Sequence, residues 1–241
     1  MKIIPAIDVL DGQVVRLTQG DYEQKTIYKV SLEDMIAQYT AHGIDHIHII
    51  DLNGAKGDNS NEKFVFDIVK RNKIRIQLGG GIRIVEKAEK LIESGIYRVI
   101  IGTVALSDPG FLKELLKKIK PERIIIAIDL LNEVIRYHGW KESAAIGLND
   151  YIEKCMELGY HRFLCTDISK DGKLGGSGID LYKKMIAKFP KIKLIASGGV
   201  GSMQDIENLS KTSAESVVIG KAIYEGKISI EKITDWNNNL V

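Results

Sequence analysis

Short apolar runs rich in β-branched residues alternate with amphipathic stretches along the whole chain. Apolar residues at every third or fourth position predict helices, and the apolar runs between them predict strands. The expected strands are 2–9, 46–51, 74–78, 98–102, 123–129, 162–167, 193–197 and 216–220. The expected helices are 31–42, 61–71, 84–94, 111–119, 149–158, 180–189 and 202–209, with a less regular one over 228–237.

This alternation predicts an α/β fold in which a parallel sheet is connected by right-handed crossovers. Eight strand–helix units in 241 residues fit a single (β/α)8 TIM barrel that spans 1–241 as one domain. An open, doubly wound sheet is the structural alternative. No linker or low-complexity segment divides the chain.

The second half of the chain repeats motifs of the first in the same order. The matched segments are 4–8 with 125–129 (IPAID, IIAID), 79–81 with 197–199 (GGG, SGG) and 101–103 with 219–221 (IGT, IGK). Their offsets are nearly constant, at 121 (129 − 8), 118 (199 − 81) and 118 (219 − 101). The repeat predicts duplicated half-barrels of roughly 1–120 and 121–241.

Two aspartates, Asp8 and Asp129, each end one of the repeated apolar strands. A buried strand has no use for a carboxylate, so the two are candidates for a functional pair. In a barrel, the carboxyl ends of the strands and the loops after them form the active face, so we expect both aspartates at one mouth. The long segments 11–30 and 130–148 follow these strands and are candidate lids.

The repeated glycine motifs follow expected strands at the same mouth. Glycine lets backbone N–H groups approach an anion closely, and the N-terminus of the next helix adds a favourable dipole. Tight strand-to-helix turns are the plainer explanation. Two such motifs beside two aspartates favour phosphate sites, and therefore a small-molecule bisphosphate with a phosphate at each end.

Composition excludes several classes of protein. A formal charge of +2 gives no argument for nucleic acid or for an anionic membrane, and there is no 18-residue apolar run. Cys155 and Cys165 fit neither a metal knuckle nor a disulfide framework. His46 and His48 alternate on one strand, but no third ligand of suitable spacing accompanies them, so no metal is expected. We therefore expect a cytoplasmic protein with no membrane or nucleic-acid partner.

The motifs, taken together, resemble a known family. They read IIPAIDVLDGQVVRLTQGDY, HIIDLNGAKG, QLGGGIR, VIIGTVALSDP, IAIDLL, TDISKDGKL, ASGGVGS and VVIGKAIYEGK. In this order they are similar to the phosphoribosylformimino-aminoimidazole carboxamide ribotide isomerases, the aldose–ketose isomerases of histidine biosynthesis. The resemblance implies a duplicated (β/α)8 fold and an Amadori rearrangement without a cofactor. We also expect a monomer.

The resemblance also implies roles for individual residues. Asp8 would be the general base and Asp129 the general acid, supported by Thr166. Implied substrate contacts are Arg16, His48, Arg83, Trp140, Asp171 and Ser202. Implied phosphate contacts are Gly81, Gly102 and Thr103 on one side, and Gly176, Gly199, Gly220 and Lys221 on the other.

Three alternatives stay open on the sequence. The cyclase subunit of imidazole glycerol phosphate synthase is a similar barrel, but its first strand has a cysteine before Leu-Asp where this chain has Ala6-Ile7-Asp8. A dual-substrate isomerase would also act on phosphoribosylanthranilate. A non-catalytic phosphate-binding barrel would not need the paired aspartates. The loop DGKLGGSG, at 171–178, departs from the DGTLSGPN that is common in the family.

Overall fold

A computed structural model describes residues 1–18, 20–71 and 73–240, so that Val241 of the predicted domain lies outside the described residues. Within them the strands are β1 (Lys2–Leu10), β2 (Gln13–Thr18), β3 (Asp21–Ile27), β4 (His46–Asp51), β5 (Arg75–Gly79), β6 (Arg98–Ile101), β7 (Ile124–Leu131), β8 (Val134–Tyr137), β9 (Glu142–Ser143), β10 (Arg162–Asp167), β11 (Lys193–Ser197) and β12 (Ser216–Ile219).

The helices of the described residues include a counterpart of every predicted helix. They are α1 (Leu32–Ala41), α2 (Leu52–Lys56), α3 (Glu62–Arg71), α4 (Val85–Glu93), α5 (Thr103–Ser107), α6 (Pro109–Lys118), α7 (Leu148–Glu157), α8 (Ile179–Lys188), α9 (Met203–Ser210), α10 (Lys221–Tyr224) and α11 (Ile230–Asn238), with a 3-10 turn at Pro121–Arg123. The short helices α2, α5 and α10 were not predicted, because each holds too few residues to show a helical period.

The parallel strands form one sheet in the order β10-β11-β12-β1-β4-β5-β6-β7, and β10 also pairs with β7. That last pairing joins the two ends of the sheet, so the chain forms the predicted (β/α)8 barrel. The open, doubly wound alternative is therefore wrong.

The chain separates into two compact units. The N-terminal unit is Ala6–Ile126, and the C-terminal unit combines Met1–Pro5 with Ala127–Val241. The units part inside β1 and β7, whereas the predicted halves part at residue 120. A single domain built from duplicated halves stays a prediction.

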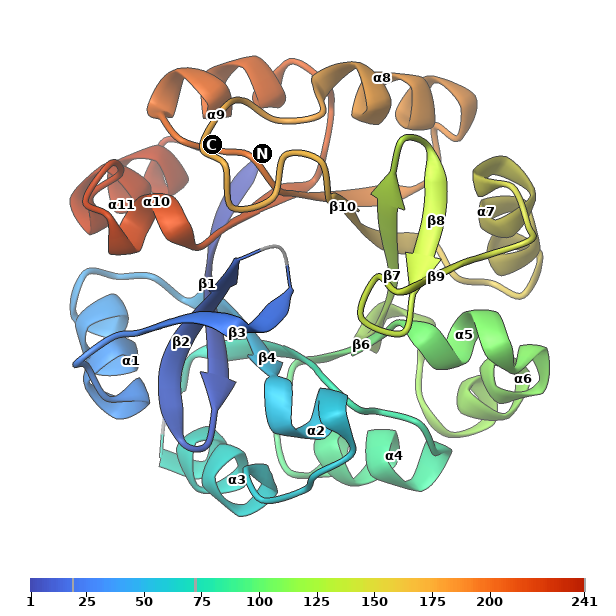
Figure 1. The fold of residues 1–241 in the computed structure, drawn as a ribbon, viewed down its shortest axis with the longest axis horizontal. Helices are drawn as coiled ribbons and strands as arrows, with labels where there is room; N and C mark the ends of the chain where they lie inside the picture. The colour runs from blue at the N-terminus through green and yellow to red at the C-terminus, as the bar shows by residue number, and fades with distance from the viewer. Residues whose placement is uncertain (19, 72, 241) are drawn as a thin grey trace. The chain divides into compact units, whose positions relative to one another are not determined.

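In the N-terminal unit, β1, β4, β5 and β6 lie side by side in parallel register. Isoleucines at 7, 47, 49 and 76 are buried, with at most 1% of their surface exposed. Helices α1, α3 and α4 cover the outer side of these strands (Figure 1). The burial of β-branched side chains between strand and helix explains why these short runs form strands here.

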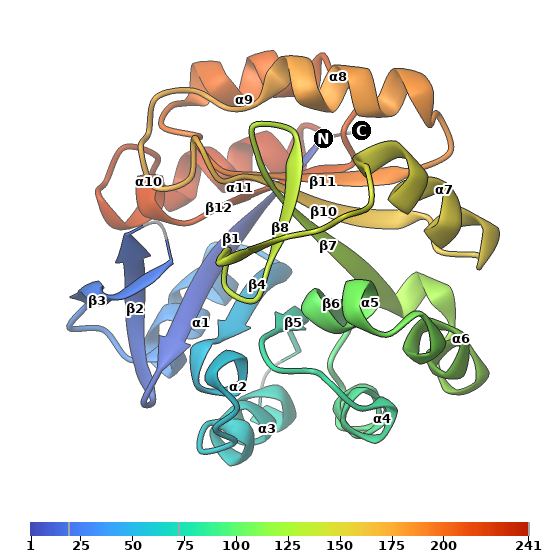
Figure 2. The same ribbon diagram turned by 45° about the vertical axis from the view of Figure 1, so that its right-hand side comes forward.

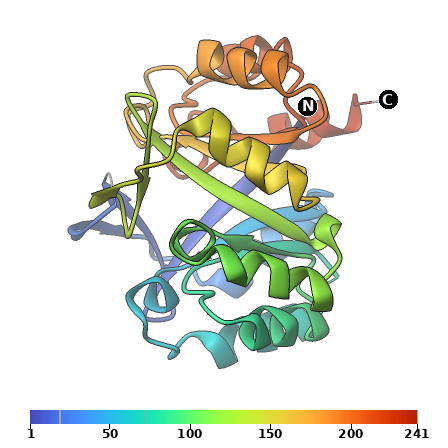
Figure 3. The same cartoon turned by 90° about the vertical axis from the view of Figure 1, so that its right-hand side faces the viewer.

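In the C-terminal unit, β10, β11 and β12 run parallel, and residues 2–5 of β1 pair with 216–219 of β12. Helices α8 and α9 lie next to each other over these strands (Figures 1 and 2), and α7 follows them along the outside (Figure 3). The isoleucines of β11 and β12 are buried as in the other unit.

The two segments predicted as long loops are instead antiparallel hairpins. β2 pairs with β1 and β3 with β2, while β8 pairs with β7 and β9 with β8. The turns have two residues, Asp11-Gly12 and Asn132-Glu133, and all four residues have positive φ. Such turns match the twist of the strands, and Asp-Gly is a strong hairpin signal, which could have predicted the first hairpin.

The last helix of the C-terminal unit holds the start of β1 through Asn237. Its Oδ1 accepts from the Ile3 N–H (2.8 Å) and its Nδ2 donates to the Ile3 carbonyl (3.0 Å), while Trp236 donates to the Met1 carbonyl. Ile3 is fully buried. The Asn237 amide thus takes the place of a neighbouring strand at this point of β1.

We expect Asn237→Ala to lower the free energy of unfolding by about 1–3 kcal/mol, because it leaves a buried N–H and carbonyl without partners. Urea denaturation measures this change. Asn238→Ala, at the exposed neighbouring position, is the control and should stay within about 0.5 kcal/mol. Equal urea midpoints for Asn237→Ala and Asn238→Ala would contradict the role of the Asn237 amide as a partner of β1.

Candidate active site

Asp8 lies near the C-terminal end of β1, before the buried Val9 and Leu10, and is ion-paired. Its Oδ2 accepts from Arg16 Nη1 at 3.1 Å, and the two side chains keep 13% and 19% of their surface exposed. The hairpin brings this arginine to the aspartate, because Asp8 pairs with Val15, the residue before Arg16. An ion pair of this kind is made by the carboxylate, so the contact favours an ionised Asp8.

Tyr22, on β3, is a neighbour of Asp8 that the sequence analysis missed. Its hydroxyl donates to the Leu52 carbonyl at 3.2 Å, and Lys56 Nζ lies 4.0 Å from the centre of its ring. Burial raises the pKa of Tyr22, and the charges of Asp8 and Asp51 raise it further. Strand β3 therefore brings the apolar ring and the neutral hydroxyl of Tyr22 close to the carboxylates of Asp8 and Asp51.

His48 lies in the middle of β4, buried beside Gln77 of β5. Its Nδ1 is 2.9 Å from Gln77 Nε2, and 4% of its surface is exposed. Burial, and next the charge of Arg16, lower the pKa of His48 to about 3. The imidazole is therefore neutral at physiological pH, and the predicted substrate contact is a neutral one.

Asp129 lies two residues before the end of β7, although the sequence predicted that the strand ends there, and it has a different partner from Asp8. Its Oδ2 accepts from the Trp140 indole Nε1 at 2.8 Å, and Thr166 of β10 also bonds to the carboxyl. Burial raises the pKa of Asp129 above its usual value, and the charge of Asp171 adds to this, while the bonds from Trp140 and Thr166 oppose it. Four predicted residues thus meet within the C-terminal unit, around a carboxyl that holds its proton more tightly than usual.

Arg136 holds the segment that carries Trp140. Its Nε and Nη2 donate to the Trp140 carbonyl at 3.1 and 3.0 Å, and its Nη1 donates to the Ser143 hydroxyl. Trp140 has a φ of 69°, a left-handed conformation that is uncommon for a large side chain. The arginine therefore stabilises the turn that aims the indole at Asp129.

Arg16 of the first hairpin and Arg136 of the second do not occupy equivalent positions of the sequence repeat, but positions that differ by one residue. With the offset of 121, Val15 corresponds to Arg136 (15 + 121) and Arg16 to Tyr137 (16 + 121). In one unit the guanidinium reaches the aspartate, and in the other it reaches a backbone carbonyl. Equivalent aspartates therefore receive a charged partner in one case and a neutral partner in the other.

The first glycine motif packs against α2. A Cβ on Gly80 would lie 2.1 Å from the Asp51 carbonyl oxygen, and one on Gly81 only 1.8 Å from that of Gly54. Arg83 donates to the carbonyls of Gly54 (3.0 Å) and Ala55 (2.6 Å). Arg83, predicted as a substrate contact, therefore binds the turn that the glycines also touch.

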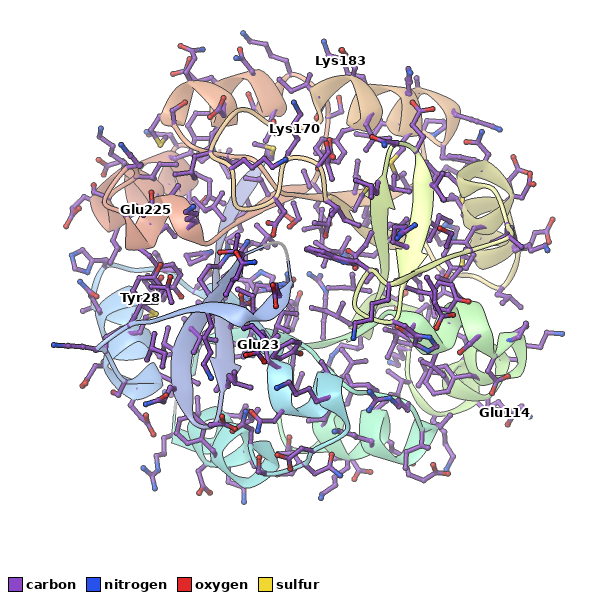
Figure 4. All side chains as sticks on the ribbon, in the orientation of Figure 1. Glu23, Tyr28, Glu114, Lys170, Lys183 and Glu225 are labelled. Atoms are coloured by element: carbon purple, nitrogen blue, oxygen red, sulfur yellow. The ribbon has the colours of Figure 1, made fainter. Side chains whose placement is uncertain are left out.

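The second glycine motif packs in the same way on the segment after β10. A Cβ on Gly198 would lie 2.8 Å from the Asp167 carbonyl oxygen, and one on Gly199 2.1 Å from that of Gly176. Gly176 N donates back to the Gly199 carbonyl at 3.1 Å. Lys170, labelled in Figure 4, belongs to this segment. A Cβ on Gly199 would lie 2.8 Å from the Lys170 Cβ.

The remaining predicted phosphate contacts stand where β6 and β12 end. Gly102 and Gly220 begin α5 and α10 without a side-chain cap, followed by Thr103 and Lys221. Lys221 Nζ donates to the Gly172 carbonyl at 2.8 Å. Each unit therefore combines a close-packed glycine motif with a short helix that begins at a glycine.

Ser202 has a structural role that was not predicted. It caps α9, and the Asp205 carboxylate accepts from the backbone N–H groups of Gly201 and Ser202, both at 2.9 Å. This capping box satisfies N–H groups that an anion would otherwise use. The S-x-x-D spacing is its sequence signal.

Among residues 1–18, 20–71 and 73–240, no group of three or more His, Cys, Asp or Glu side chains is arranged to hold a metal ion. Over that same range, no helix has the length and apolar character needed to cross a membrane.

A family model described as "Histidine biosynthesis protein" matches residues 2–229. A protein of Alteromonas mediterranea is 42% identical over 98% of this chain and 99% of its own length. One of Pseudoalteromonas atlantica is 41% identical over 98% of this chain and 100% of its own, and one of Psychromonas ingrahamii is 38% identical over 98% and 99%. All three are named as isomerases of a phosphoribosyl-(phosphoribosylamino)methylideneamino imidazole carboxamide.

We expect Gly199→Ala to destabilise the protein more than Gly159→Ala does. Both glycines have positive φ, at 82° and 100°, but only the Cβ at 199 would meet a backbone oxygen. The strain at φ > 0 costs about 1–2 kcal/mol in either variant, so the difference between them reports the contact with Gly176. Thermal unfolding of both variants measures it, and equal losses would mean that the packing of the two loops is not tight.

Proposed function

The chain belongs to the histidine biosynthesis protein family, and on that premise we propose that it isomerises the imidazole carboxamide named in its relatives. That name describes a compound with two phosphoribosyl groups, one of them joined through an amino nitrogen. The reaction is an aldose–ketose isomerisation of the amino-linked ribose, an Amadori rearrangement, within histidine biosynthesis. The contrast between ion-paired Asp8 and partly buried, indole-bonded Asp129 is the observation that supports it most.

The rearrangement needs one group that gives a proton and one that takes a proton. Protonation of the ribose ring oxygen opens the ring to a Schiff base. Loss of the proton on C2 then gives an enolamine, which relaxes to the aminoketose. A carboxylic acid and a carboxylate can perform these two transfers when their environments separate their affinities for protons.

Asp129 suits the role of the general acid. Its raised pKa keeps a larger share of the carboxyl protonated near neutral pH, and the indole and hydroxyl bonds fix its orientation. Asp8 suits the role of the general base, because its ion pair with Arg16 favours the carboxylate that must take a proton. We propose that Thr166, which bonds to the Asp129 carboxyl, supports it in this role. Because ring opening and the proton transfers need no external oxidant or reductant, no cofactor is proposed.

A bisphosphate substrate suits the duplicated glycine motifs. The proposed contacts are Gly81, Gly102 and Thr103 for one phosphate, and Gly176, Gly199, Gly220 and Lys221 for the other. Backbone N–H groups where a short helix begins bind anions. Arg83 and Lys221 already bond to carbonyls of neighbouring segments, so they shape these loops as well as supplying positive charge.

The other substrate contacts that we propose are Arg16, His48, Trp140, Asp171 and Ser202. Trp140 and His48 offer an indole and an imidazole near the two aspartates of their own units. The charge of Asp171 raises the pKa of Asp129, and Ser202 caps the N-terminus of α9. We further propose a cytoplasmic monomer whose partner is this small molecule, with no nucleic-acid or membrane partner.

We expect Asp8→Asn and Asp129→Asn each to lower kcat by about 10²–10⁴-fold, because each removes one positioned proton-transfer group. Substrate binding should be largely retained, since an amide has nearly the size of a carboxyl group. The absorbance change during turnover of the aminoaldose ribotide measures kcat. Asp180→Asn, on the exposed start of α8, is the control and should keep full activity.

Retained turnover in either variant would remove the role assigned to that aspartate. No turnover by the unaltered protein would contradict the isomerase itself. Comparable turnover of phosphoribosylanthranilate would make the protein a dual-substrate isomerase.

We expect Trp140→Phe to move the alkaline limb of the kcat profile to higher pH. The indole bond stabilises the ionised form of Asp129, so its loss raises the pKa further and keeps the acid protonated at higher pH. The pH dependence of kcat measures this shift whatever the change in absolute rate. Trp236→Phe, whose indole bonds to the Met1 carbonyl, is the control. A limb that stays in place, or moves to lower pH, would show that Asp129 is not the acid.

A further inference from the structure

Gln77 is a fully buried glutamine in the middle of β5, between the buried residues Ile76 and Leu78. Burying an amide is costly unless its polar atoms have partners. Its Nε2 meets His48 Nδ1 at 2.9 Å, whereas its Oε1 has no hydrogen-bond partner among the described residues. A leucine would suit this position better for stability alone, so the amide needs an explanation, and His48 is the polar side chain that it contacts.

The strand register places the pair on β4 and β5, in the layer of Ala6, which is one layer below that of Asp8. His48 is in register with Ala6 on one side and with Gln77 on the other. Residues in register on parallel strands project to the same face, and so do residues two apart on one strand. Asp8 therefore projects to the same face as His48 and Gln77, one layer further along β1.

The contact also determines which nitrogen of His48 carries the proton. A glutamine Nε2 is only a donor, so His48 Nδ1 accepts, and the proton of a neutral imidazole is then on Nε2. Burial and the charge of Arg16 lower the pKa of His48 to about 3, which keeps the ring neutral. Its Nε2 makes no hydrogen bond to a described residue, and 4% of the residue stays exposed.

We propose that Gln77 is a positioning residue that holds His48 as a neutral Nε2–H donor for an oxygen atom of the substrate. This role rests on the proposed isomerase function and assigns His48 a fixed hydrogen bond instead of a proton transfer. It leaves both proton transfers to Asp8 and Asp129. It also explains why an amide is buried where an apolar side chain would pack as well.

The tautomer can be measured without substrate, so this test stands apart from the test of the isomerase. Protein with ¹⁵N-labelled histidine is studied by NMR, and the His48 signals are those that disappear in His48→Asn. We expect a protonated Nε2 and an unprotonated Nδ1. Gln77→Glu should move the proton to Nδ1, because a carboxylate only accepts. A protonated Nδ1 in the unaltered protein, or a tautomer that does not change in Gln77→Glu, would overturn the proposal.

Enzyme activity tests whether the positioning of His48 by Gln77 matters for the reaction. Gln77→Met keeps the length of the side chain but lacks the donor, and we expect kcat/KM to fall about tenfold, the effect of one misplaced hydrogen bond. Gln38→Met, on the exposed face of α1, is the matched control. Thermal unfolding checks that Gln77→Met is folded, and Gln77→Glu supplies a second variant in the same assay. An unchanged kcat/KM in both position-77 variants would overturn the positioning role.

If the unaltered protein were inactive on the ribotide, the proposed isomerase function would be wrong. The NMR result would still decide whether Gln77 pairs with His48 as proposed.

Discussion

The hydrogen bond from the Trp140 indole to Asp129 is the interaction on which the candidate site depends most. The Asp129 carboxyl lies among apolar residues of β7 and is poorly solvated, so burial raises its pKa. The indole and Thr166 limit this rise and fix the orientation of the group. Arg136 in turn holds the Trp140 carbonyl, so the protonation of one carboxyl is tied to the geometry of a whole hairpin.

The same hairpin architecture gives a different result beside Asp8. There the arginine of the hairpin contacts the carboxylate itself, at 3.1 Å. A one-residue difference in where the arginine stands is enough to give one aspartate a charged neighbour and the other a neutral one. The repeat in the sequence therefore produces a similar hairpin beside each aspartate. The residues that depart from the repeat give the two aspartates chemically different partners.

Strand and helix periodicity predicted the barrel and its main elements, because burial against helices requires the pattern that the sequence displays. The hairpins were predicted as loops, since β3 and β9 are mostly exposed and polar, while β2 and β8 are short and contain adjacent apolar residues that do not alternate with polar ones. Asp129 and Trp140 could be named from the family resemblance, but not their bond, which depends on a left-handed residue in an irregular turn. Gln77 begins the motif QLGGGIR but was given no role, because one glutamine in an apolar strand has no distinctive spacing.

The glycine motifs have a physical origin that the sequence alone could not separate from anion binding. Gly81 and Gly199 each touch a backbone carbonyl of a neighbouring segment, so close packing by itself excludes any side chain there. Tight packing and phosphate binding are compatible, since both need a backbone without side chains. The packing requirement holds the loops in place before any substrate arrives.

The order in which the two aspartates lose their protons tests the central claim most directly. Carboxyl ¹³C signals of Asp8 and Asp129, assigned with the asparagine variants and followed by NMR against pH, would measure it in the substrate-free protein. The account predicts that Asp8 ionises first and that Asp129 keeps its proton to higher pH. Simultaneous ionisation, or an Asp129 that ionises before Asp8, would contradict it.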